Sequence, residues 1–278
     1  MQVKPNMRET QSAASAARRL LAGAGSATAL FYEYPTAPKL DNFAHGLTSD
    51  GELVIVTCKP DIRFLPNNSA STATNHATNE LNSAETYRIR FEISRDAPRF
   101  DVKILTASLH LLGDLRWEAP AEVARLLSDD KLPENLRVLL GVPGARLATI
   151  HFQQAVLHDP NGITPLSRVE IISASTAQFP SSTQELDCYA LVGAQPNNVL
   201  SRICRAVVAG QAPGKVCSKC PLKLAHASLA NRVFCADIDS SGVTLMYVGI
   251  GEMTTVYAQF SEPVKNISQF SAQLSQLG

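Results

Sequence analysis

The hydrophobic pattern is clearest at residues 41–58, which it predicts to form a β-hairpin. Residues 53–56 read LVIV, an apolar run that is rich in β-branched side chains and short enough for a buried strand. The preceding Ser49-Asp50-Gly51 supplies a turn, since glycine accepts the positive φ that a tight connection requires. We therefore take this hairpin as the element around which the N-terminal half is built.

Strict alternation at residues 85–94 predicts a half-buried strand, with apolar side chains on one face and charged ones on the other. The apolar face carries Tyr87, Ile89, Phe91 and Ile93, and the charged face carries Arg88, Arg90 and Glu92. Further extended segments are expected at residues 27–32, 100–117, 147–157 and 167–173, with a bend or bulge at Gly113-Asp114. About seven strands with short, mostly antiparallel connections favour a small closed barrel over alternating βαβ units.

Helical spacing appears at both ends of the chain. Small apolar residues recur at helical intervals in residues 7–21, and Pro120 opens a short helix. After residues 179–182, where a proline and a serine pair interrupt the pattern, the character changes to helices and strands together. We expect helices at 183–194, 198–209, 221–231 and 268–277, and strands at 233–238, 243–248 and 254–260. The fold class is therefore α+β, with an N-terminal barrel domain (1–180) and a C-terminal α+β domain (181–278).

In the last predicted helix, Ile267, Phe270, Leu274 and Leu277 share one face and should be buried together. Residues 66–84 are almost wholly small and polar, which predicts a mobile loop in which His76 is solvated.

Composition narrows the function classes. The 278 residues carry no net charge and only 18% charged side chains, so nothing basic invites nucleic acid. The first residues do not resemble a signal peptide, and no apolar run is long enough to span a bilayer, so we expect a cytoplasmic protein with no membrane partner. Phosphate-binding loops, nucleophile elbows and H-E-x-x-H patterns are missing from the sequence, which gives hydrolase and kinase functions no support.

Cysteine spacing gives the sharpest local motif, Cys217-Ser218-Lys219-Cys220-Pro221. Two thiols at this spacing fit one metal or one redox disulfide, and a helix opening at Pro221 would stabilise a thiolate. Cys204 and Cys235 are candidates to complete a four-sulfur metal site. Structural or incidental thiols remain the alternative.

Histidines and arginines in strands are the other candidates. His45 lies on the first strand of the hairpin, where a neutral imidazole can ligate iron or donate to a flavin carbonyl. His110 and His151 are also expected in strands and can converge with it inside a barrel. Arg88 and Arg90 share one face, where both can bind a propionate or phosphate, or simply be solvated.

Three stretches together carry a family resemblance: AHGLTSDGELVIV at 44–56, VKILTASLHLLGDLRW at 102–117, and the tail from Val243 with its F-x-x-P-V turn at residues 260–264. The chain resembles the pyridoxamine-phosphate-oxidase-like FMN-binding split-barrel family, in its haem-utilisation branch with a C-terminal α/β domain. The resemblance runs from about residue 8 to the end. It implies a split β-barrel, a homodimer, and a bound cofactor.

The resemblance implies three alternatives for the cofactor. Haem, bound in a cleft where barrel and C-terminal domain meet, is the first, in a protein of haem utilisation or degradation. FMN in an oxidoreductase is the second, with Thr57, Lys59 and Arg63 in the place of the phosphate site. A regulatory or interaction protein without cofactor is the third, since no histidine follows His226 as a C-terminal axial ligand. The resemblance leaves open whether the protein is an enzyme.

Overall fold

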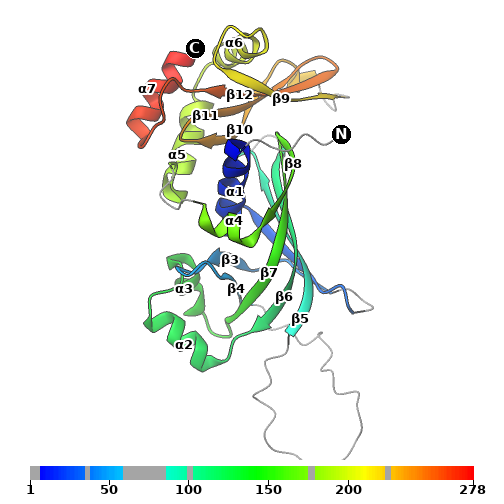
Figure 1. The fold of residues 1–278 in the computed structure, drawn as a ribbon, viewed down its shortest axis with the longest axis vertical. Helices are drawn as coiled ribbons and strands as arrows, with labels where there is room; N and C mark the ends of the chain where they lie inside the picture. The colour runs from blue at the N-terminus through cyan, green and yellow to red at the C-terminus, as the bar shows by residue number, and fades with distance from the viewer. Residues whose placement is uncertain (1–6, 35–37, 59–85, 99–102, 175–178, 223–226) are drawn as a thin grey trace, which may run out of the picture. The chain divides into compact units, whose positions relative to one another are not determined.

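The computed structural model describes residues 7–34, 38–58, 86–98, 103–174, 179–222 and 227–278. The chain is α+β, and its larger sheet is a curled antiparallel half-barrel (Figure 1). Its strands follow the order β2-β1-β5-β6-β7-β4-β3, and β8 pairs with β7. The bounds are β1 Ser26–Leu30, β2 Lys39–Leu40, β3 Ala44–Leu47, β4 Leu53–Thr57, β5 Thr86–Asp96, β6 Leu105–Trp117, β7 Arg146–Asp159 and β8 Gly162–Ser167.

The hairpin expected at residues 41–58 is confirmed as β3 and β4. The two strands pair antiparallel with His45 opposite Ile55, and Gly51 in the turn has a φ of 81°. All of β4 is buried because β7 pairs along its other edge. The alternating strand is confirmed as β5, whose residues 87, 89, 91 and 93 are buried. This burial fixes which side of β5 faces the core and which side is open.

Two pairs of helices accompany this sheet. α1 (Met7–Leu21) contacts α4 (Arg168–Ser173), where Arg18 donates a hydrogen bond to the carbonyl of Ile172. α2 (Pro120–Ser128) and α3 (Glu134–Leu140) place Leu126 and Leu136 in a cluster with Val54, Val56 and Leu147. Residues 134–140 make only about two helical turns, too few for helical periodicity to stand out, so the sequence did not predict α3.

The strand expected at 167–173 is wrong, since this segment forms α4. Ser167 explains the difference, because its hydroxyl and the Glu170 side chain form a capping box. The backbone N–H of Ser167 donates to Glu170 Oε2 (2.7 Å), and the N–H of Glu170 donates to Ser167 Oγ (3.2 Å). The local capping bonds outweigh the β propensity of Val169, Ile171 and Ile172.

The smaller sheet has four strands in the order β10-β11-β12-β9, with bounds β9 Gly214–Pro221, β10 Val233–Asp239, β11 Gly242–Val248 and β12 Glu252–Gln259. α5 (Ser182–Gly193), α6 (Asn197–Val208) and α7 (Ile267–Leu277) share one apolar core with it. In α7, Phe270 and Leu274 are buried, and Ile267 and Leu277 pack beside them, as expected. The helix expected at 221–231 is wrong: β9 runs through Pro221, and the described part of the segment beyond it holds only a short 3-10 helix, Ala227–Leu229.

Contacts divide the chain into two units. The first comprises residues 1–93, 109–156 and 165–173, and the second comprises residues 94–108, 157–164 and 174–278. The ends of β5, β6 and β7 thus belong to the second unit, and the domain boundary near residue 180 stays a prediction. Within the described ranges, no helix is long and apolar enough to cross a membrane.

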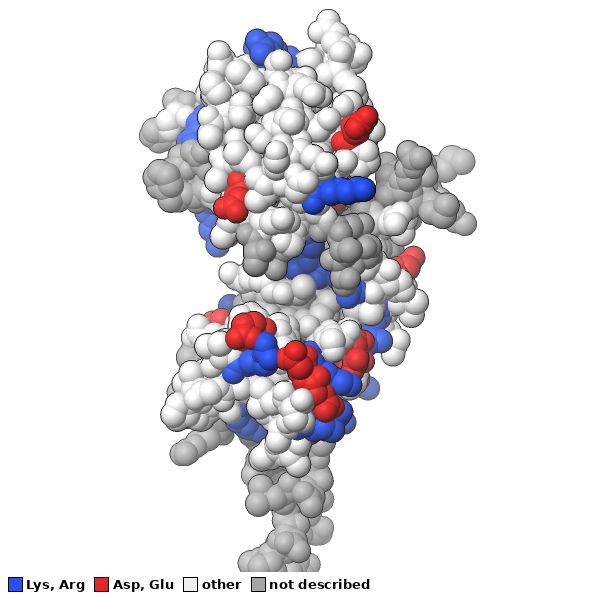
Figure 2. All heavy atoms as spheres, turned by 90° about the vertical axis from the view of Figure 1, so that its left-hand side faces the viewer, with Lys and Arg blue, Asp and Glu red and all other residues white. Residues whose placement is uncertain are grey.

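Charged side chains over α2 and α3 alternate in sign (Figure 2). Arg125 pairs with Glu122 (2.6 Å) and Asp129 (3.1 Å), and Arg137 pairs with Asp130 and Glu134. Such exposed pairs add little stability.

Candidate functional site

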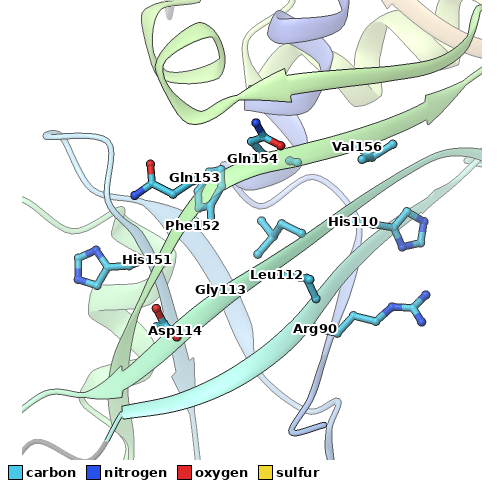
Figure 3. Close-up of a pocket in the computed structure, with 12 residues that line it drawn as sticks. Arg90, His110, Leu112, Gly113, Asp114, His151, Phe152, Gln153, Gln154 and Val156 are labelled. Atoms are coloured by element: carbon cyan, nitrogen blue, oxygen red, sulfur yellow. The ribbon is translucent and has the colours of Figure 1, made fainter. Parts of the chain in front are cut away.

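A groove of about 510 Å³ lies in the first unit, over the outward faces of β5, β6 and β7 (Figure 3). Three strands contribute to it because outward side chains of neighbouring strands stand side by side. Its polar lining includes Arg90 from β5, His110 and Asp114 from β6, and His151, Gln153 and Gln154 from β7. In volume it falls within the range usual for small-molecule sites.

Arg90 and His110 lie at one end of the groove (Figure 3). Both contact Glu92: its Oε2 is 3.5 Å from Arg90 Nη2 and 3.5 Å from His110 Nδ1. A carboxylate therefore lies beside Nδ1 of this imidazole, on the side where carboxylates are often found behind a metal-ligating histidine. This end of the groove therefore offers the guanidinium of Arg90 and the imidazole of His110.

His151 and Asp114 lie at the other end (Figure 3). His151 Nδ1 is 3.6 Å from Glu52 Oε2, a buried oxygen that has no hydrogen-bond partner among the described residues. Arg168 holds the other oxygen of Glu52 at 2.7 Å, so the carboxylate is fixed in place. His151 is therefore a second imidazole with a carboxylate beside Nδ1, and its side chain is 55% exposed.

Between the two ends the groove is apolar. Leu112 is 63% exposed at its centre, and Phe152 contributes to the lining. Gly113 allows β7 to approach closely, because a Cβ at this position would lie 2.5 Å from the carbonyl oxygen of His151. Gln153 and Gln154 are both exposed although they are consecutive, which indicates an extra residue that shifts the alternation of β7.

The expectation that His110 and His151 converge with His45 inside the barrel is wrong. His110 and His151 point to the outward face of the sheet, whereas His45 is only 4% exposed. Its Nε2 is 2.8 Å from the carbonyl oxygen of Leu20, and since a carbonyl only accepts, Nε2 carries the proton. His45 lines a separate pocket of about 280 Å³ in the same unit.

The buried ring of His45 should make stability depend on pH. Burial lowers the pKa of His45 from the ordinary 6.5, and the hydrogen bond to Leu20 offsets this only in part. As the pH falls below 6.5 the unfolded chain takes up a proton that the folded chain does not, so the free energy of unfolding decreases. We expect His45→Gln, whose amide can still donate to Leu20, to flatten this decrease. Denaturant titrations between pH 7 and about pH 5 measure it; parallel profiles for the two proteins would contradict the assignment.

Arg88 does not reach the groove. It lies on the outward face of β5 as expected, is 64% exposed, and pairs with Glu33 at 3.4 Å. Thr57 donates from its hydroxyl to the carbonyl of Asn42 (3.0 Å). Lys59, Arg63, His76 and the expected loop at 66–84 lie outside the described residues, so the role of Lys59 as a cofactor ligand stays a prediction.

Cys217 and Cys220 lie on β9, where Cys220 is opposite Met253 of β12 and a register shift falls beside Cys217. The expected helix N-terminus at Pro221 is therefore wrong, and the motif has no helix dipole to stabilise a thiolate. Three residues along a strand span about 10 Å, beyond the separation that a disulfide bridges. Cys204 is buried on α6, and the described residues contain no group of three or more His, Cys, Asp or Glu that could hold a metal.

Arg95 is the polar residue that the sequence analysis missed. It lies on the buried face of β5, 8% exposed, and donates to Glu185 Oε1 (3.0 Å) and Asp237 Oδ1 (2.7 Å). Burial alone would lower the pKa of Arg95, but Asp237 and Glu185 raise it, so the guanidinium stays charged. The sequence did indicate that Arg95 is buried, because this residue continues the odd-numbered apolar face of the strand. This ion pair belongs to the second unit and is not part of the groove.

Comparisons with known proteins find similarity in structure only. No protein-family model and no curated protein matches the sequence. Among solved structures, a haem-binding protein from Mycobacterium smegmatis is similar at 13% identity and a TM-score of 0.47, with 99% of this chain and 97% of that chain covered. A protein of unknown function from Agrobacterium tumefaciens is similar at 16% identity and a TM-score of 0.36, with coverage of 99% and 98%.

Proposed function

We propose that this protein binds a tetrapyrrole, haem, in the groove over β5, β6 and β7. The observation that carries the proposal is that one groove is lined by Arg90 and His110 at one end and by His151 at the other, with the exposed Leu112 between them. In Figure 3 the side chain of His151 points to the opposite side from those of Arg90 and His110. The resemblance in sequence to haem-utilisation proteins agrees with it. The proposal puts haem within the first unit instead of the cleft between domains that the resemblance implies.

The donor set of the groove fits such a ligand. Apolar side chains at the centre suit a porphyrin face, and Arg90 suits a propionate, which a guanidinium binds bidentately. His110, beside Arg90, donates to the same carboxylate end. His151, at the opposite end, would hold the haem iron through Nε2, because Glu52 lies beside its Nδ1.

The protein contributes orientation and environment. Haem, when bound, supplies a redox-active iron whose potential depends on the axial ligand and the polarity around it. Glu52, held by Arg168, would increase the electron donation of His151 if Nδ1 closed from its present 3.6 Å to a hydrogen bond with Oε2. Leu112 and Phe152 exclude water from one face of the site. Turnover, a homodimer and a cytoplasmic location stay predictions.

Titration of haem into the purified protein, followed at the Soret band, tests the proposal. We expect His151→Ala to shift the Soret band and to weaken binding by about tenfold or more, since an iron ligand is lost. His110→Ala is the matched control in the same groove and should keep the Soret position. Wild-type spectra for both variants, or no saturable binding by the wild type, would contradict the proposal.

A further inference from the structure

We infer that Glu92 sets how tightly the groove holds a carboxylate of its ligand, because Glu92 occupies the position that this carboxylate would take. Glu92 lies on the outward face of β5, two residues beyond Arg90 and beside His110 of β6. This role rests on the proposed function, since haem is the ligand whose propionates would reach this end of the groove.

One oxygen of Glu92 lies beside both groups that a ligand carboxylate would use. Its Oε2 is 3.5 Å from Arg90 Nη2 and 3.5 Å from His110 Nδ1. Arg90 and His110 line the groove, whereas Glu92 is not among the described residues of its lining. A ligand carboxylate that enters the groove must therefore compete with Glu92 for these two side chains.

The contacts of Glu92 are weak enough to be exchanged. A hydrogen bond between a guanidinium and a carboxylate is about 2.7–2.9 Å long, so both distances at Glu92 are longer than a ligand carboxylate can reach. The side chains of Arg90 and Glu92 are 54% and 36% exposed, and such exposed pairs contribute little free energy. A ligand carboxylate can also bind the guanidinium with two oxygens. We therefore expect Glu92 to reduce the affinity for the ligand without preventing binding.

Soret titrations of the wild type, Glu92→Gln and Glu33→Gln test this role. Glu92→Gln removes the competing charge at nearly the same size and should bind haem about two- to fivefold more tightly, as for one exposed charge pair. Glu33→Gln is the matched control, since it changes the net charge equally but lies beside Arg88, outside the groove, and should keep the wild-type affinity. Haem dimethyl ester, which has no free carboxylate, should bind all three proteins with equal affinity.

A probe without haem separates the role of Glu92 from the proposed function. Succinate carries two carboxylates, and its titration into the isotope-labelled full chain should give saturable nuclear magnetic resonance shifts of the Arg90 and His110 side chains. Glu92→Gln should reach saturation at lower succinate concentrations than the wild type. The neutral diamide of succinate should leave these signals unshifted. If the wild type does not bind haem, the proposed function fails, and the succinate titration still decides the role of Glu92.

Three results would overturn the inference. The first is an affinity of Glu92→Gln for haem that equals or falls below that of the wild type; a fall would show that Glu92 holds Arg90 and His110 in place. The second is an equal gain in affinity for haem dimethyl ester. The third is a succinate titration that does not saturate, or that is the same for Glu92→Gln and the wild type.

Discussion

Replacing Arg95 by alanine is expected to lower the free energy of unfolding of the second unit by about 3–5 kcal/mol, the usual cost of breaking a buried ion pair. The guanidinium is 10% exposed and lies between Glu185 (14%) and Asp237 (24%). Without it, two poorly solvated carboxylates remain next to each other. The cost arises from these unpaired charges, because the intact pair itself adds little net stability.

Urea denaturation measures this loss. Arg88→Ala is the matched control, since Arg88 lies on the same strand in an exposed pair with Glu33 and its loss should change stability by no more than about 0.5 kcal/mol. A second variant, Arg95→Lys, keeps a charge but cannot contact both carboxylates in the same way, so an intermediate loss is expected. Equal midpoints for Arg95→Ala and Arg88→Ala would show that the buried pair is dispensable.

The comparison of Arg88 with Arg95 shows what alternation can reveal. The period of two in β5 correctly assigned Arg88 and Arg90 to the outward face. The same period assigns Arg95 to the apolar face, where an arginine needs carboxylate partners. Glu185 and Asp237 are 90 and 142 residues away, so the sequence gives no indication of which acids pair with it.

Hydrophobic patterns predicted most strands. They failed at two places, where side-chain capping or strand pairing determined the backbone conformation. At residues 168–173, side-chain capping by Ser167 and Glu170 converted an apolar, β-branched run into a helix. At Cys217 and Cys220, pairing with β12 kept the chain extended through Pro221. Hydrophobic periodicity carries no information about side-chain caps or about which strands pair with each other.

The groove could not be predicted as a site for a similar reason. Arg90, His110 and His151 were each candidates from the sequence, but they come from three strands whose order depends on the fold. Glu52, which lies beside His151, was not a candidate because it follows the turn of the hairpin and has no motif of its own. The sequence named individual residues, and their grouping required the order of the strands.

Introducing a carboxylate in the centre of the groove should weaken haem binding by roughly 30-fold, equivalent to about 2 kcal/mol for burying a charged group under an apolar ligand. Leu112→Asp makes this change at a side chain that is 63% exposed, so folding should not be affected. Leu105→Asp is its control, because Leu105 lies on the same strand, is 56% exposed and does not line the groove.

The most direct test of haem binding in this groove is therefore a Soret titration of three proteins in parallel: the wild type, Leu112→Asp and Leu105→Asp. Haem binding in the groove predicts saturable binding by the wild type and by Leu105→Asp with the same affinity, and a roughly 30-fold weaker affinity for Leu112→Asp. Identical titration curves for Leu112→Asp and Leu105→Asp would contradict it.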